Sequence, residues 1–160
     1  MYWILDGYNI ILADEKLSKM ARNNLEYARD ALAQEILSSE RFRRQNVSLV
    51  FDGRSGGSSE KIASNLEIKF SKSTESADDL IKSMIGNFKS RSSVFIVSND
   101  LSIVNYAKEC AANVSSSRDF LSLIRVGKNN TKEDGSSSEK PSVPGKSDFE
   151  LLRLFKEKNR

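Results

Sequence analysis

Aspartate side chains follow the apolar segments of this 160-residue sequence, close to the point where each segment ends. The runs Tyr2–Leu5 and Val47–Phe51 each end in an Asp-Gly pair, and Val94–Val97 leads into Ser-Asn-Asp. A further segment, Leu66–Phe70, precedes a helical stretch whose first turn carries two neighbouring aspartates. The acids at these four places are Asp6, Asp52, Asp78 with Asp79, and Asp100. Because the carboxyl ends of parallel strands meet at one edge of a sheet, we expect these acids to lie close together.

Carboxylates crowded at one edge repel one another, and burying each charge without a partner costs free energy. A divalent cation removes this conflict, and Mg²⁺ or Mn²⁺ takes oxygen ligands without needing His or Cys. A metal held in this way activates a bound water and neutralises charge on a phosphate in transfer. The pattern therefore indicates metal-assisted phosphoryl chemistry.

Each acid also has a structural interpretation. Asp-Gly pairs are common in turns, Asp78 and Asp79 suit the positive end of a helix dipole, and Asp100 suits an N-cap. The sequence pattern alone leaves a metal site and four separate structural roles about equally open. The convergence of all four positions on one sheet edge is the argument for the site.

The composition excludes other chemistries. The chain contains no His, which removes Ser-His-Asp and Cys-His catalysis and His-ligated zinc. Its one Cys, Cys110, leaves no internal disulfide partner and no Cys-cluster metal site. A haloacid-dehalogenase phosphatase needs a second acid where Tyr8 stands. A receiver domain needs a Lys where Ser115, Ser116 and Ser117 stand.

The elements that must position the acids alternate between strand and helix. Apolar residues at helical spacing predict one long helix from about Lys19 to Arg43, a second after its N-cap Ser76, a third after Asp100, and a last one over Ser117–Val126. Residues 53–59 read as a flexible loop, Leu66–Phe70 as a candidate edge strand and 112–114 as a short strand. This order predicts an α/β fold of three layers, α/β/α, with a mainly parallel sheet of about five strands.

The C-terminal part differs in composition from the rest. We expect residues 1–126 to form the folded domain, 127–147 a disordered linker, and 148–158 a short amphipathic helix. Residues 125–160 carry 9 basic and 6 acidic side chains, which accounts for the whole net charge of +3. Any attraction for polyanions must therefore come from this tail or from local patches. No stretch approaches 18 apolar residues, so we expect a cytoplasmic protein with no membrane partner.

Four motifs in order along the chain resemble the YacP-like branch of the NYN domain family, which is PIN-like. The opening Asp-Gly-Tyr-Asn is the most specific of them, and the resemblance spans about residues 2–124. The motifs are Ile4-Leu5-Asp6-Gly7-Tyr8-Asn9, Val50-Phe51-Asp52-Gly53, Glu75-Ser76-Ala77-Asp78-Asp79 and Val97-Ser98-Asn99-Asp100. The resemblance implies a PIN-like fold and a metal-dependent endoribonuclease. It also implies a role in mRNA turnover, for some relatives at the ribosome.

The resemblance assigns roles residue by residue. Asp6, Asp78 and Asp100 match the family's metal-binding acids, and Asp52 matches its remaining catalytic acid. The expected cofactor is Mg²⁺ or Mn²⁺, as one ion or two. The expected supporting residues are Asn9, Asn99 and Asp79, of which Asp79 sits where it can complete a capping pair with Ser76. Many relatives carry one more Asp shortly after the last motif, where this chain has Leu101, Ser102 and Ile103.

A carboxylate-held metal predicts attack of water on the phosphorus of single-stranded RNA, leaving 5′-phosphate and 3′-hydroxyl ends. Arg54, Lys61 and Lys72 follow or flank strand ends and are candidate phosphate contacts, although isolated cations usually serve only as surface charge. Tyr8 is a candidate for stacking on a base, or for packing under the first loop. The alternative function is a PIN-like module that binds RNA or the ribosome without turnover.

Overall fold

The computed structural model describes residues 1–53 and 56–126. The strands in this part are β1 (Tyr2–Asp6), β2 (Asn46–Phe51), β3 (Ser58–Ala63), β4 (Leu66–Phe70), β5 (Val94–Val97) and β6 (Asn113–Ser115). The helices are α1 (Gly7–Leu12), α2 (Glu15–Asn23), α3 (Leu25–Leu37), α4 (Ala77–Asn87), α5 (Leu101–Glu109) and α6 (Ser117–Arg125). Short 3₁₀ turns precede two strands, at Glu40–Phe42 and Arg91–Ser93. The expected linker 127–147 and helix 148–158 lie outside the described residues.

The strands form one sheet in the order β3-β4-β2-β1-β5-β6, parallel throughout except where β3 runs antiparallel to β4. The predicted α/β class with a mainly parallel sheet is confirmed. Strand β3 was not predicted, because it begins inside the segment expected to be a loop. The prediction of Leu66–Phe70 as an edge strand is wrong, because β3 pairs with its outer side. The first four residues of β3 are exposed, so the strand lacks the apolar signal of a buried one.

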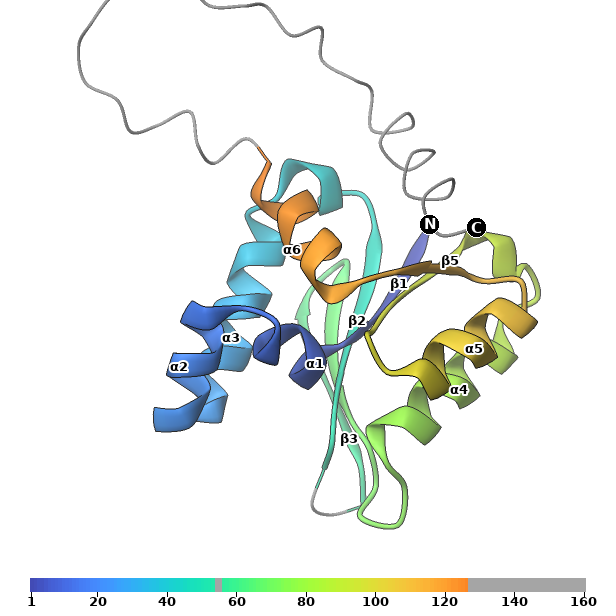
Figure 1. Ribbon diagram of the computed structural model, residues 1–160, viewed down its shortest axis with the longest axis horizontal. Helices are drawn as coiled ribbons and strands as arrows, with labels where there is room; N and C mark the ends of the chain where they lie inside the picture. Colours follow the sequence, from blue (N-terminus) through green and yellow to red (C-terminus); the bar gives the residue numbers. More distant parts are fainter. Residues whose placement is uncertain (54–55, 127–160) are drawn as a thin grey trace, which may run out of the picture.

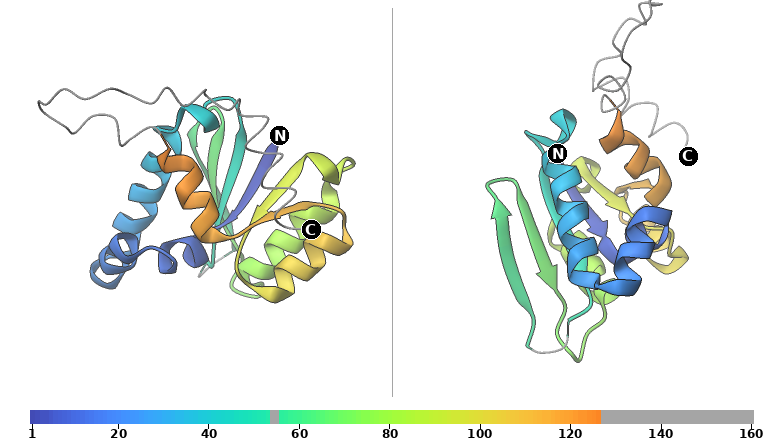
Figure 2. Two further views of the ribbon diagram at one scale, coloured as in Figure 1. Left: turned by 45° about the horizontal axis from the view of Figure 1, so that its top comes forward. Right: turned by 90° about the vertical axis from the view of Figure 1, so that its left-hand side faces the viewer.

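Helices cover both faces of the sheet (Figures 1 and 2). α1, α2, α3 and α6 pack on one face, and α4 and α5 pack on the other. Successive strand residues point to opposite faces, so Trp3 joins the first core and Ile4 the second. Trp3 is stacked on Phe95, with ring centroids 4.5 Å apart, and anchors the larger core. This three-layer arrangement is the one that the alternating sequence predicted.

The long helix predicted over Lys19–Arg43 is wrong in detail. Helix α2 begins earlier, at Glu15, and ends at Asn23. Asn24 interrupts the helix because its backbone is extended, at φ −158°. The Asn24 side-chain oxygen accepts a hydrogen bond from the Glu26 backbone N–H at 2.9 Å and so caps a new helix, α3. The apolar period continues across the break, which explains why periodicity alone read the two helices as one.

Two glycines allow close approach of the chain at the first and second motifs. A Cβ on Gly7 would lie 2.4 Å from a ring carbon of Phe51, and a Cβ on Gly53 would lie 2.0 Å from the Ser71 carbonyl oxygen. Asp6-Gly7 was expected to form a turn, but helix α1 starts there directly, with Asp6 as its N-cap. Across residues 1–53 and 56–126, none of the helices has the length and apolar character needed to cross a bilayer.

Candidate active site

Asp6 ends the central strand β1 and is buried, with 7% of its surface exposed. Its Oδ2 accepts a hydrogen bond from the Ser98 hydroxyl at 2.9 Å, and its Oδ1 accepts a long one from the Asn9 backbone N–H at 3.5 Å. Burial raises the pKa of Asp6, and the charges of Asp78 and Asp100 raise it further, against the lowering effect of those hydrogen bonds. The hydrogen bonds therefore hold the carboxylate in place, while burial and the neighbouring negative charges destabilise its ionised form.

Ser98 links two of the predicted acids. It is almost fully buried at the end of β5, and while its hydroxyl donates to Asp6, its Oγ accepts the backbone N–H of Asp100 at 3.0 Å. Asp100 is the N-cap of α5, and its Oδ1 accepts the backbone N–H of Ser102 at 2.8 Å. Ser98 lies within the fourth sequence motif, but the motif by itself assigns it no role. A small hydroxyl between two motif acids is the signal that could have identified it.

Asp78 stands in the first turn of α4, the helix that covers the opposite face of the sheet from α1. Its pKa is raised by burial, then by the charges of Asp100, Asp52 and Asp79, while Lys82 lowers it. Asp79 points elsewhere: its carboxylate and Ser76 form a complete capping box, which lowers the pKa of Asp79. This confirms that Asp79 caps the helix.

Asp52 connects the end of β2 to the start of α4. Its Oδ1 accepts the backbone N–H of Ala77 at 2.7 Å, while the residue remains exposed. Its charge is one of those that raise the pKa of Asp78. The bond fixes the second motif against the third, so the four motifs that are far apart in sequence meet at one edge of the sheet.

Asn9 and Asn99 hold the neighbouring loops together. The Asn9 Oδ1 accepts hydrogen bonds from the Asn99 backbone N–H at 3.0 Å and from the Ser117 hydroxyl at 2.8 Å. The Asn99 Oδ1 in turn accepts the Ser117 backbone N–H at 3.1 Å. These bonds join the first turn of α1, the loop after β5 and the start of α6. Ser117, fully buried, is a member that sequence reasoning missed.

The donor set suits a hard divalent cation in its chemistry, because every candidate ligand is a carboxylate oxygen. Burial is the main cause of the raised pKa of both Asp6 and Asp78, and the charge of Asp100 raises both further. Even so, no three acidic or Cys side chains in residues 1–53 and 56–126 stand close enough together, as they are placed, to hold a metal ion. The acids thus share an edge and an electrostatic field without forming a closed cage.

Of the predicted RNA contacts, Tyr8 and Lys72 lie near the acids, whereas Lys61 does not. Tyr8, in the first turn of α1, is 49% exposed beside Asp6. Lys72 lies two residues beyond β4, at the end of the sheet that carries the acids, and its Cγ is next to Gly57. Lys61 lies in β3, where its backbone is in register with that of Glu67, toward the opposite end of β4. Arg54 lies outside the described residues.

Comparison with known proteins places this geometry in a family. The sequence matches the family described as YacP-like NYN domain over residues 3–156, well beyond the 2–124 that the motifs alone indicated. The uncharacterized protein YacP of Bacillus subtilis is 34% identical over 83 residues, which are 51% of this chain and 49% of that relative. The alignment thus spans about half the length of the curated relative.

Crystal structures of Rae1 (YacP) from Bacillus subtilis share the fold. A point variant superposes with a TM-score of 0.65 at 24% identity, covering 78% of this chain and 74% of that one. The unsubstituted protein gives 0.62 at 23% identity over the same shares. Together with the motif acids gathered at the edge of a parallel sheet, these matches show that the chain belongs to the YacP-like NYN domain family, whose members are generally nucleases.

Proposed function

We propose that this chain is a metal-dependent endoribonuclease that cuts single-stranded RNA. The observation that carries the proposal is the convergence of Asp6, Asp78 and Asp100, from three separate elements, at one edge of the sheet, where Asp6 is buried and shares Ser98 with Asp100. Gathering several negative charges in this way costs the folded protein free energy, and a bound cation offsets that cost. The family's general nuclease character supports the same conclusion.

Asp6, Asp78 and Asp100 would hold Mg²⁺ or Mn²⁺, with Asp52 as the fourth acid of the site. When bound, the ion supplies an activated water and neutralises charge on the scissile phosphate. The protein's own residues do the positioning: Ser98 orients Asp6 and Asp100, and the bond from Ala77 fixes Asp52. Since no closed cage exists beforehand in the described residues, we expect metal binding to draw the carboxylates together.

The substrate side of the proposal uses the exposed residues at this edge. Tyr8 presents an open ring for a base, and Lys72 a cation for a phosphate. Messenger RNA is the proposed substrate class and the ribosome a proposed partner, both carried by the family resemblance. Co-sedimentation of the full chain with ribosomes tests the partner separately from the chemistry.

The absence of a ready cage in the described residues favours one alternative, an RNA-binding module without turnover. Incubation with a labelled single-stranded RNA decides between the two. We expect cleavage with Mn²⁺, no cleavage with EDTA or with Asp6→Asn, and products that carry 5′-phosphate ends. RNA that is bound but left intact at saturating Mn²⁺ would establish the module instead.

A further inference from the structure

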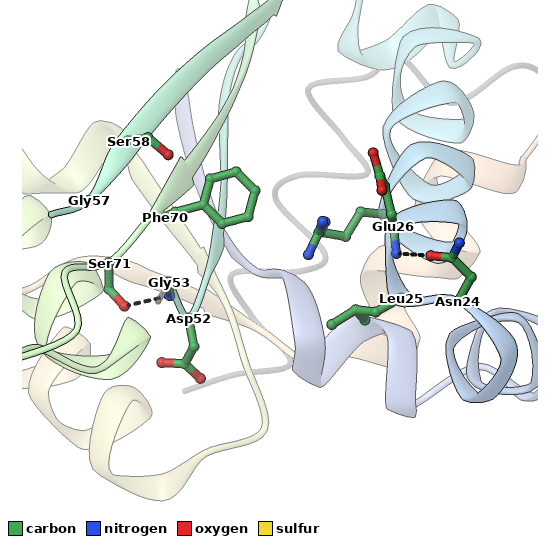
Figure 3. Close-up of a pocket in the computed structure, with 10 residues that line it drawn as sticks. Asn24, Leu25, Glu26, Asp52, Gly53, Gly57, Ser58, Phe70 and Ser71 are labelled. Carbon is green, nitrogen blue, oxygen red and sulfur yellow. Dashed lines mark hydrogen bonds between the residues drawn. The ribbon is translucent and has the colours of Figure 1, made fainter. Parts of the chain in front are cut away.

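A cleft of about 640 Å³ opens beside Asp52, on the side of the sheet edge away from Asp6. Figure 3 shows Asp52, Phe70 and Ser71 on one side of it and Asn24, Leu25 and Glu26 on the other. The first wall belongs to the ends of β2 and β4, and the second to the start of α3. The volume lies within the range of sites that enclose small organic ligands.

Arg29 lines this cleft in an unusual environment. Its guanidinium carbon lies 5.1 Å from the ring centroid of Phe70 and 5.5 Å from that of Phe51. The two rings are themselves stacked, with centroids 6.2 Å apart. Within the described residues, Arg29 makes no ion pair and no hydrogen bond, so the rings are its contacts. Arg29 lies in the second turn of α3, the helix that begins after Asn24.

The charges of the cleft select among ligands. Glu26 and Asp52 also line it, so two carboxylates oppose the single cation of Arg29. This balance disfavours a phosphate group. A nucleobase fits better, because unstacked RNA bases bind by stacking on aromatic rings and guanidinium planes, while carboxylates accept their ring and exocyclic N–H groups.

We propose that this cleft binds one unstacked base of single-stranded RNA, stacked on the Arg29–Phe70 pair. The inference rests on the proposed function, because Asp52 belongs both to the cleft and to the acid edge. Through its bond to the Ala77 N–H it stands at the boundary between them. A strand whose phosphate reaches the acids would therefore place a neighbouring base in the cleft.

The test measures binding of a fluorescein-labelled single-stranded oligoribonucleotide to the full chain in EDTA, by anisotropy over a range of salt concentrations. Arg29→Met keeps the apolar stem and removes the planar cation, and Arg29→Lys keeps the charge and removes the plane. We expect both variants to bind about tenfold more weakly than wild type, with an unchanged salt dependence. Arg22→Met, which removes an exposed cation from α2, is the matched control and should bind within about twofold of wild type.

A second measurement does not depend on the variants being folded. An oligonucleotide carrying 5-bromouridine, irradiated on the wild-type protein, should cross-link to the peptide that contains Phe70. Cross-links confined to other peptides would overturn the inference. So would full affinity in Arg29→Lys combined with a salt slope lowered by about 0.7 in Arg29→Met, because that pair of results assigns Arg29 to a phosphate.

Cleavage with Mn²⁺ separates this inference from the proposed function. Wild-type cleavage together with wild-type affinity in both Arg29 variants refutes the base site and leaves the nuclease standing. A cross-link at Phe70 without cleavage refutes the nuclease and leaves the base site standing. A wild-type chain that does not bind the oligonucleotide overturns the inference.

Discussion

Replacing Ser98 by alanine tests how the buried Asp6 carboxylate is maintained. The substitution removes the hydroxyl that donates to Asp6 Oδ2 and the oxygen that accepts the Asp100 backbone N–H. A hydrogen bond to a buried charge contributes about 1.5–3 kcal/mol, and a neutral one about 1 kcal/mol. We expect Ser98→Ala to lower the free energy of unfolding by about 2 kcal/mol at pH 7. This is less than the sum of the two bonds, because Asp6 keeps 7% of its surface exposed and solvent can offset part of the loss.

The loss should depend on pH, and its sign follows from the pKa of Asp6. That pKa is already raised in the folded protein, so the folded state loses stability as pH rises and Asp6 ionises. The Ser98 hydroxyl lowers the pKa of Asp6, and removing it raises that pKa further. The variant therefore loses more stability than wild type as pH rises through this range. At pH values low enough to protonate Asp6 in the folded state, the difference should fall to about 1 kcal/mol, because the remaining hydrogen bonds are then neutral ones.

Urea denaturation followed by the fluorescence of Trp3, the single tryptophan and fully buried, measures both values. The matched control is Ser93→Ala, just before the opposite end of β5. Among the described residues, the exposed Ser93 hydroxyl donates only to the Ser90 carbonyl. Its loss should change the free energy of unfolding by less than about 0.5 kcal/mol. In an Asp6→Asn background the cost of Ser98→Ala should also shrink to about 1 kcal/mol. Equal costs at both pH values and in both backgrounds would refute the reasoning.

The remaining predictions concern the metal, the helix cap and the tail. In the metal-free protein, Asp6→Asn should raise the melting temperature, because it removes a buried carboxyl group whose pKa is raised. Mg²⁺ should raise the melting temperature of wild type more than that of Asp6→Asn or Asp100→Asn. Equal shifts in the melting scans would contradict the site. Asp78→Asn should lose most RNA cleavage, whereas Asp79→Asn should keep it and melt earlier because the capping box is lost; the opposite ranking would refute the assignment. A chain ending at Val126 should melt cooperatively and still cut a short oligonucleotide while losing co-sedimentation with ribosomes, and its failure to fold would show that the domain extends further.

The parallel core strands and the position of the acids at their ends could be predicted from the sequence. Apolar runs such as Val94–Val97 carry a strong strand signal because they are buried on both faces of a parallel sheet. An Asp at the end of such a run must lie at the carboxyl edge whatever else the chain does. The capping role of Asp79 was also readable, since Ser76 stands three residues before it and the pattern is local.

Other features depended on contacts between distant parts of the chain. β3 exists because its backbone pairs with β4, and an exposed edge strand needs no apolar pattern to do so. The break at Asn24 is a local capping event that leaves the hydrophobic period intact, so periodicity could not detect it. The stacking of Arg29 on Phe70 likewise brings together residues of α3 and β4 that are far apart in the sequence.

The same division runs through the candidate site. The residue types and their spacing determined which acids face the edge, because strand ends in a parallel sheet are set by local hydrophobicity and by chain order. Only the tertiary structure decided that Ser98 lies between Asp6 and Asp100, and that Ser117 joins Asn9 to Asn99. Those bonds connect residues up to 108 positions apart. Their geometry is fixed by the packing of whole elements, which no local pattern in the sequence encodes.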